Sequence, residues 1–194
     1  MNRKLVVGLT GASGLIYGFK LVEQCDLLKK YYSEIHVIYT NGANRVSLIE
    51  NNESIENILG RLKCIDSLSN EDNWSSPLAS SSNLLSTDGV LIPASLNTIA
   101  KLANGIQDNL VLRVFSSLIR LKNKIVIVVR ETPLSTIDLY NLYKLSRQGA
   151  IILPASPGFY VKPSNVNELI YFIVGKVLDV LGVEHSLYSR WKSS

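Results

Sequence analysis

Five polar or glycine-containing segments follow apolar runs that are typical of buried strands. They are Gly11–Ser13, Thr40–Asn41, Ser95 with Thr98, Arg130–Glu131, and residues 157–160, which end in Tyr160. Ligands of an open parallel sheet bind outside the carboxyl ends of its strands, so we expect these segments to lie together. Hydroxyls and backbone amides suit phosphate and ribityl groups, and an arginine suits an anion. The set therefore predicts a site for a phosphorylated, partly flat ligand.

The stretch 4–14 reads KLVVGLTGASG and predicts a strand, a glycine-rich turn and the start of a helix. Such a turn directs backbone N–H groups and the positive end of a helix toward a phosphate or a flavin. Its spacing is G-x-x-G-x-x-G, which differs from the G-x-G-x-x-G dinucleotide fingerprint. On spacing alone, a tight turn whose glycines only permit close packing explains the stretch equally well.

Each of these residues also has a purely structural interpretation. Ser13 and Ser95 are suitable helix N-caps, Arg130 and Glu131 could form a surface ion pair, and Tyr160 could be a core aromatic residue. Their joint placement after strands favours the site. We find no Ser/His/Asp set, no metal-ligand cluster and no P-loop lysine. Acid–base chemistry would therefore fall to Glu131, Glu50 or Tyr160.

The composition fits one cytoplasmic domain spanning residues 1–194. The formal net charge of +4 suits anionic small ligands, and no basic stripe indicates nucleic acid. Neither a signal peptide nor an apolar run long enough to insert into a membrane is present. The two cysteines, Cys25 and Cys64, have no metal-site spacing, and we interpret them as thiols of a reducing compartment, not as a disulfide.

Strand and helix patterns alternate along the chain. Strands are predicted at 5–7, 34–40, 89–92, 124–130 and 150–153, and helices at 15–30, 41–50, 54–62, 97–103, 109–121, 135–147 and 166–181. The segment 51–73 is polar and broken, and the serine-rich segment 75–86 is interpreted as a loop packed over a site. This order predicts an α/β, three-layer, Rossmann-like fold, with a mainly parallel central sheet covered by helices on both faces.

Several motifs of the chain together resemble those of the flavin prenyltransferases, the UbiX family, within the flavin-binding, cysteine-decarboxylase-like superfamily. The resemblance runs essentially from end to end. The motifs are TGASG at 10–14, NW at 73–74, P-x-S-x-x-T at 93–98, RETPL at 130–134, LPASPGFY at 153–160 and RW at 190–191.

The resemblance implies a reaction without a metal. Family members bind reduced FMN and dimethylallyl phosphate, join the prenyl group to flavin N5, and close a fourth ring at C6. The prenylated FMN then serves a UbiD-type decarboxylase. The family also implies a homo-oligomer, often a dodecamer, with sites at subunit interfaces. The loop 75–86 and the carboxyl-terminal residues 183–194 are candidates for those contacts.

The resemblance also implies residue roles. FMN contacts are expected from the turn, from the segment after the third predicted strand and from the RETPL arginine: Gly11, Ala12, Ser13, Thr40, Ser95, Leu96, Asn97, Thr98 and Arg130. Glu131 is the expected proton relay, and Ser13 reaches the flavin or its phosphate. Glu50 and Trp74 are expected to line the prenyl pocket. Tyr160, Lys176 and Arg120 are expected to hold the prenyl phosphate.

Some positions depart from the family pattern. Arg120 stands where a lysine is usual, Lys176 where an arginine is usual, and Asn41 where a lysine is common. Because arginine and lysine differ in hydrogen-bond geometry, these changes bear on the prenyl donor more than on the fold. Two alternatives remain: an FMN-binding electron carrier, and a flavin-dependent decarboxylase of the same superfamily. The latter uses a Pro-x-Met-Asn motif, but the one methionine here is Met1.

Overall fold

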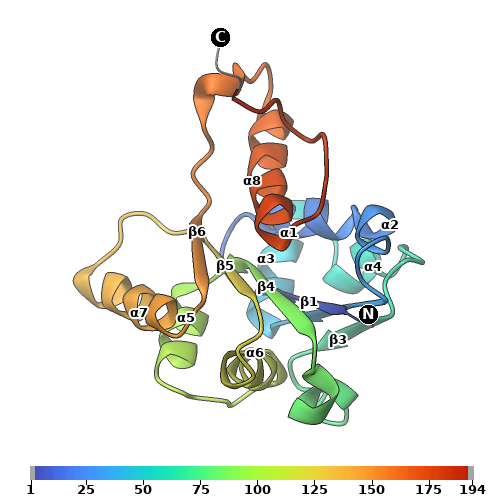
Figure 1. The fold of residues 1–194 in the computed structure, drawn as a ribbon, viewed down its shortest axis with the longest axis vertical. Coiled ribbons are helices and arrows are strands. Elements are labelled where there is room, and N and C mark those ends of the chain that lie inside the picture. The colour runs from blue at the N-terminus through green and yellow to red at the C-terminus, as the bar shows by residue number, and fades with distance from the viewer. Residues whose placement is uncertain (1–2, 192–194) are drawn as a thin grey trace.

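A six-stranded sheet forms the centre of the molecule, as the computed structural model of residues 3–191 shows (Figure 1). Its strands lie in the order β3-β2-β1-β4-β5-β6, and every neighbouring pair is parallel. The strands are β1 (Lys4–Leu9), β2 (Glu34–Tyr39), β3 (Ser67–Asn70), β4 (Thr87–Ala94), β5 (Ile125–Val129) and β6 (Ile151–Pro154). The predicted parallel sheet is confirmed.

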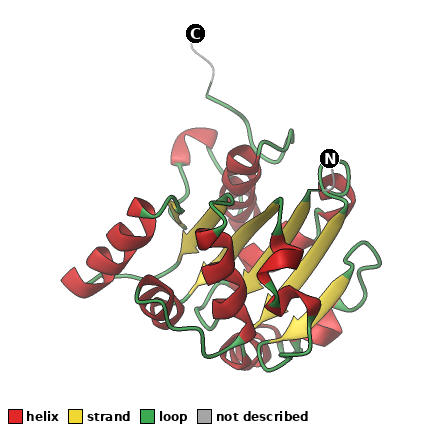
Figure 2. Cartoon of the chain, turned by 60° about the horizontal axis from the view of Figure 1, so that its bottom comes forward, coloured by secondary structure: helices red, strands yellow, loops and turns green. Residues whose placement is uncertain are grey.

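Helices cover both faces of this sheet, as Figure 2 shows. One face is covered by α1 (Leu15–Val22), α2 (Cys25–Leu28), α3 (Asn41–Asn51), α4 (Ile55–Leu59) and α8 (Val166–Leu181). The other is covered by α5 (Leu96–Ala103), α6 (Leu110–Arg120) and α7 (Thr136–Arg147). Successive residues of β1 alternate between these two cores: Leu5 and Val7 belong to the first, and Val6 to the second. The three-layer prediction is confirmed.

Two elements differ from the sequence prediction. The single helix predicted at 15–30 is two helices, α1 and α2, separated by a turn at Glu23 and Gln24. The polar segment 51–73 contains the edge strand β3, which pairs with β2. β3 reads SLSN and buries only Ser69, so its sequence carries neither an apolar run nor an alternating pattern.

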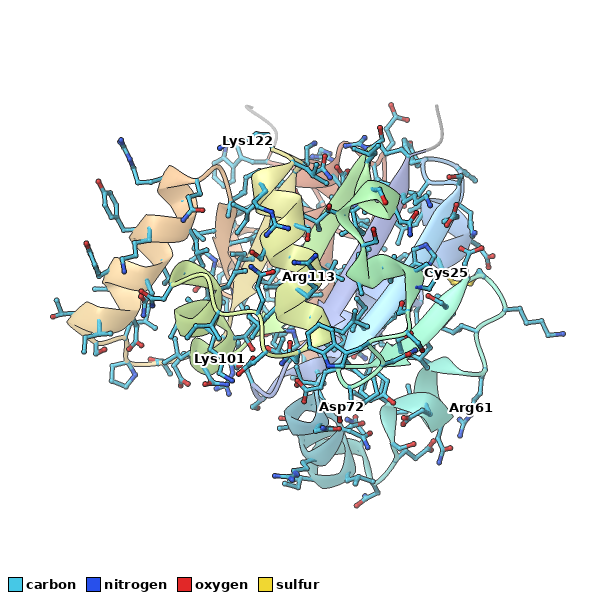
Figure 3. The ribbon with its side chains drawn as sticks, turned by 90° about the horizontal axis from the view of Figure 1, so that it is seen from below. Cys25, Arg61, Asp72, Lys101, Arg113 and Lys122 are labelled. Carbon is cyan, nitrogen blue, oxygen red and sulfur yellow. A yellow bond between two sulfur atoms is a disulfide. The ribbon has the colours of Figure 1, made fainter. Side chains whose placement is uncertain are left out.

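The cysteine prediction is wrong. Cys25 and Cys64 form a disulfide, with Cα atoms 5.6 Å apart and a sequence separation of 39. Cys25 begins α2, and Cys64 lies in the turn after α4, so the two helices that cover one face of the sheet bring them together (Figure 3). Sequence spacing does not reveal such a meeting, because it depends on how the helices pack.

The serine-rich loop 75–86 forms two short 3₁₀ helices, η1 (Pro77–Ala79) and η2 (Ser81–Leu84). They bury Leu78 and Leu84 in the second core. The loop also lines a cavity of about 510 Å³ with Lys4, Glu34 and His36, at the amino-terminal ends of the strands. It therefore does not cover the strand ends at which the ligand site was predicted.

An arm rises from the carboxyl end of β6, turns through η3 (Phe159–Val161), and returns as α8 to the sheet (Figure 1). Among residues 3–191, none of the helices is long and apolar enough to cross a membrane.

Close packing of α1 on the sheet depends on Gly18. A Cβ at this position would lie 2.5 Å from the Ile92 carbonyl oxygen and 2.5 Å from Leu9 Cδ2. Because the carbonyl belongs to β4, it cannot move aside, and Gly18→Ala is expected to lower the free energy of unfolding by about 1–3 kcal/mol. Urea unfolding measures this. Gly42→Ala is the control: its Cβ would meet nothing closer than 3.5 Å, and no loss of stability is expected.

Candidate functional site

A cavity of about 440 Å³ opens at the carboxyl ends of β1, β2, β4 and β5. Seven of the predicted site residues line it: Gly11, Thr40, Ser95, Leu96, Asn97, Thr98 and Glu131. Gly42, Glu71, Lys101, Asn109 and Leu112 complete the lining. The strand ends therefore meet as the sequence predicts, and we call this space the strand-end cavity.

Hydrogen bonds hold the glycine turn after β1 to the ends of β4 and β5. The Ser95 amide donates to Thr10 Oγ1 at 2.7 Å, and that hydroxyl donates to the Pro93 carbonyl, which joins the ends of β1 and β4. Arg130 Nε donates to the Ser13 carbonyl at 2.9 Å. Gly14 has a φ of 90°, a conformation that favours glycine. The turn is thus held in one shape against the end of β5.

Glu50 reaches the same turn from the last turn of α3. Its two carboxylate oxygens accept from the Gly14 amide at 3.1 and 3.2 Å, at the amino-terminal end of α1. A carboxylate is favourable there because the helix end carries partial positive charge. The structure therefore brings Glu50 to the residue that follows Ser13, although Glu50 and Gly14 are 36 residues apart in sequence.

The serine and threonine predictions divide into two cases. Thr40 and Ser95 are helix N-caps: Thr40 Oγ1 accepts from the Ala43 amide at 3.0 Å, and Ser95 Oγ accepts from the Thr98 amide at 3.3 Å. Both also line the strand-end cavity. Ser13 does not cap α1, since Gly14 occupies the N-cap position. Within the described residues the Ser13 hydroxyl has no hydrogen-bond partner and remains available to a ligand.

Ala12 is buried, and its amide donates to the Thr10 carbonyl at 2.8 Å within the turn.

Glu71 is a polar residue of the site that the sequence prediction missed. One oxygen accepts from the Asn41 amide at 2.6 Å, and the other accepts from Asn109 Nδ2 at 2.5 Å. The carboxylate thereby joins the starts of α3 and α6. Glu71 follows β3 directly, so recognition of that edge strand would have revealed it among the strand-end residues.

Glu131 lines two cavities at once. Besides the strand-end cavity, it lines a space of about 310 Å³ with Arg130, Pro154 and Ser156, between the ends of β5 and β6. Its carboxylate is exposed and accepts from the Thr132 amide at 3.0 Å. Glu131 is the acidic residue that borders both spaces. It is therefore placed to exchange a proton with a molecule in either.

Tyr160 and Lys176 form a second group on the arm. The Tyr160 ring contacts Phe172 edge-on, with ring centroids 5.7 Å apart, and Lys176 Nζ lies 5.3 Å from the centroid of Phe172. The Tyr188 ring, which packs against Phe172, also faces Lys176, with 4.9 Å from Nζ to its ring centroid. The hydroxyl of Tyr188 is the main cause of a raised pKa of Lys176, so the amine stays cationic. A phenol and a cation here suit a phosphate.

Two further predicted residues, Trp74 and Arg120, are not among those that line the strand-end cavity. Trp74 is half exposed, in the segment after β3. Arg120 is the last residue of α6, where its guanidinium donates to Ser117 Oγ at 3.0 Å. The cavity lies at the other end of this helix, beside Asn109. Eleven residues of helix span about 16 Å. Figure 3 shows Lys122, just beyond α6, at the opposite end from Lys101 and Asp72.

Within one chain, the arm group and the strand-end cavity are separate. No hydrogen bond, ion pair or ring contact in residues 3–191 joins Tyr160 or Lys176 to the cavity lining. In the same part of the chain, no group of three or more His, Cys, Asp or Glu residues could hold a metal ion. The site thus offers hydroxyls and amides at the strand ends, and the Glu131 carboxylate between two cavities. The Lys176 cation lies apart from them, in the arm group.

Comparisons with known proteins agree with this arrangement. The Flavoprotein family matches residues 1–178. A protein of Saccharolobus solfataricus named flavin prenyltransferase UbiX is 41% identical over 98% of this chain and 93% of its own length. A protein of Aquifex aeolicus with the same name is 39% identical over 98% of this chain and 99% of its own.

A solved structure gives the same result. The crystal structure of AnUbiX (PadA1) in complex with FMN and dimethylallyl pyrophosphate has a TM-score of 0.89 and 29% identity, and the likeness covers 100% of both chains. With relatives of this identity along its whole length, the chain belongs to the Flavoprotein family and, within it, to the UbiX flavin prenyltransferases.

Proposed function

We propose that the protein joins a dimethylallyl group from dimethylallyl phosphate to N5 and C6 of reduced FMN. The observation that carries this proposal is the full-length relationship to UbiX flavin prenyltransferases. The site supports it, because the strand-end cavity holds seven of the residues that the resemblance assigns to FMN or to catalysis. The electron-carrier and decarboxylase alternatives are not favoured by these relatives.

The residues of the cavity fit FMN. Gly11, Thr40, Ser95 and Thr98 supply hydroxyls and backbone amides at the strand ends, and the Ser13 hydroxyl is free to bind. Arg130 holds the turn through the Ser13 carbonyl and adds positive charge beside it. When bound, reduced FMN supplies the electron-rich ring to which the prenyl carbon becomes attached. The protein's part is to bind and orient that ring.

Glu131 is the residue that we assign to proton transfer. Departure of the phosphate from dimethylallyl phosphate leaves an allyl cation and a phosphate anion, and ring formation releases a proton. A carboxylic acid can protonate the leaving phosphate, and the resulting carboxylate can accept the released proton. Its position between the two cavities gives Glu131 access to both events. Glu50, fixed at the Gly14 amide, and Trp74 are proposed to line the prenyl pocket.

The phosphate is proposed to bind Tyr160, Lys176 and Arg120. Cationic groups stabilise the negative charge that grows on a departing phosphate. Arg120 lies at the far end of α6 from the cavity of its own chain. We therefore propose that it reaches the phosphate of a neighbouring copy. A UbiX-like decarboxylase from Escherichia coli O157:H7, 32% identical with a TM-score of 0.89 over 98% of this chain and 100% of that one, is dodecameric.

Assembly and partners follow as proposals from the same family. We propose a homo-oligomer, as a dodecamer, in the cytoplasm, with a UbiD-type decarboxylase as recipient of the product. Large apolar side chains exposed on the arm and on α7 support assembly; they include Phe159, Tyr140 and Tyr143, at 70%, 57% and 57% exposure. Exposed apolar surface of this kind is covered in many oligomers.

Anaerobic incubation with FMN, dithionite and dimethylallyl phosphate tests the function. Mass spectrometry of the extracted flavin should show a species heavier than FMN by one prenyl unit. The same incubation with dimethylallyl diphosphate compares the two donors. Recovery of unchanged FMN from both incubations would reject the assignment and favour the electron carrier.

A further inference from the structure

The last described segment of the chain, residues 183–191, folds back along α8, and we call it the tail. Gly182 ends α8 with a φ of 79°, a conformation that favours glycine, and the Val183 amide donates to the Leu178 carbonyl at 2.9 Å. Val183 is buried, which anchors the start of the tail. The chain then passes over the outer side of α8 beside Lys176.

One carboxylate on α8, that of Asp179, binds the tail at three points. It accepts from His185 Nε2 at 3.0 Å, from the Tyr188 hydroxyl, and from Arg190 at 2.6 Å. His185 Nδ1 accepts from the Leu187 amide at 3.1 Å, so the proton of a neutral ring sits on Nε2 and points to Asp179. Burial alone would raise the pKa of Asp179, but Arg190, Tyr188 and His185 together lower it. Asp179 is thus held as an anion.

The surface of α8 is shaped for this contact. A Cβ at Gly175, one turn before Asp179, would lie 2.5 Å from Tyr188 Cδ1 and 2.7 Å from His185 Cε1. Glycine at this position therefore lets the two tail rings rest on the helix backbone. The His185 side chain is 1% exposed. The buried His185 ring, packed on Gly175 and bound to the partly buried Asp179 carboxylate, indicates a fixed contact.

The tail in turn touches both members of the arm group. Tyr188, which donates to Asp179, packs against Phe172 with ring centroids 4.9 Å apart and faces Lys176 Nζ. Trp191 contacts the Tyr160 ring edge-on, at 5.4 Å between centroids. Lys176 therefore faces Tyr188, which Asp179 binds directly. Tyr160 contacts Trp191, the residue that follows Arg190, and Arg190 is also bound by Asp179.

We propose that Asp179 is a positioning residue: it fixes the tail on α8 and thereby orients Lys176 and Tyr160 as one phosphate-binding pair. This inference rests on the proposed function, since it assumes that the pair binds the prenyl phosphate. Asp179 itself does not touch the substrate. Its loss frees Tyr188 and Trp191, and Lys176 and Tyr160 then sample several rotamers, which weakens binding of the phosphate but not of FMN.

The test uses Asp179→Asn, which keeps the shape and removes the charge, and Gly175→Ala, which keeps the charge and displaces the tail. Calorimetry on protein loaded with oxidised FMN measures the Kd for dimethylallyl phosphate, because the reaction needs reduced flavin. Both variants are expected to raise this Kd by about tenfold or more, the change produced by losing one charge-assisted contact. Under turnover, KM rises while kcat falls less, and the Kd for FMN is unchanged.

A second measurement follows the tail without any ligand. Trypsin cleaves after Arg190, whose side chain is tied to Asp179 in the wild type, and mass spectrometry should show faster cleavage in both variants. Glu184→Gln is the matched control. It removes a carboxylate from the same tail, and that side chain makes no hydrogen bond or ion pair within residues 3–191. Both Kd values and the cleavage rate should stay at wild-type levels.

The outcomes separate this inference from the function on which it rests. If the wild type does not bind dimethylallyl phosphate, the proposed function is wrong and the inference falls with it. If the wild type binds it and both variants bind it equally well, the function stands and the positioning role of Asp179 is rejected. If both Asp179→Asn and Gly175→Ala also lose FMN binding, the tail does not act on the phosphate alone, and the proposed positioning role is rejected.

Discussion

Replacement of Glu131 by glutamine is expected to slow prenyl transfer by about 10²- to 10⁴-fold, the usual contribution of a general acid or base. Glutamine keeps the size and the hydrogen-bonding oxygen of the side chain but can neither give nor take the proton. Glu131 is exposed, and within residues 3–191 its carboxylate hydrogen-bonds only to the adjacent Thr132 amide, so the fold should not change. Anaerobic single-turnover kinetics with saturating dimethylallyl phosphate measures the rate.

FMN affinity distinguishes a chemical role of Glu131 from a binding role. Fluorescence titration of Glu131→Gln should give the wild-type Kd for FMN. Glu23→Gln is the control, because it removes an exposed carboxylate that pairs with Lys20 on the surface of α1, and its rate should equal that of the wild type. A Glu131→Gln protein that transfers the prenyl group at the wild-type rate would show that another group handles the proton.

Mixed oligomers of two inactive variants are expected to regain activity. Arg120→Met should lose phosphate binding, and Glu131→Gln should lose proton transfer, so each is inactive alone. Suppose that Arg120 acts on the site of a neighbouring copy. A site is then intact when an Arg120→Met chain supplies Glu131 and its neighbour, a Glu131→Gln chain, supplies Arg120. Random assembly from equal amounts gives about a quarter of the sites in this state. Co-expression with two affinity tags, followed by tandem purification, provides the mixture.

The result decides where Arg120 acts. An Arg120 that served its own chain would leave every site of the mixture with one defect, and activity would stay at background. Arg120→Lys is the control for charge: it restores the residue usual at this position in the family and should retain most activity. The Arg120 guanidinium donates within α6 to Ser117 Oγ at 3.0 Å and to Ser116 Oγ at 3.5 Å, so losing these contacts at the helix end should cost little stability.

Much of the fold was predictable because its signals are local. The β-branched run of β5, the glycine turn after β1 and the helical spacing of α6 and α8 each depend on nearby residues. Parallel strands require helical crossovers, so their alternation also predicted three layers. β3 was missed because an edge strand with one buried residue leaves no apolar pattern. The Cys25–Cys64 disulfide was missed because it joins two elements that only packing brings together.

The site divides in the same way. The sequence by itself determined the chemistry available after each strand, since residues that follow parallel strands must share one edge of the sheet. It therefore predicted Thr40, Ser95 and Glu131 together. Only the tertiary structure decided which groups form hydrogen bonds with one another: Glu50 with the Gly14 amide, Arg130 with the Ser13 carbonyl, and Tyr188 with Asp179. Such contacts depend on the angle at which each helix packs.

Tertiary structure also decided the distances that local pattern cannot supply. Arg120 and Asn109 belong to one helix region in sequence, yet the length of α6 sets them at opposite ends of that helix. Tyr160 and Lys176 stand on an arm that leaves the sheet, apart from the cavity that Glu131 lines. Residue types determine what chemistry is possible, but the lengths and directions of rigid elements determine which of those residues share a site.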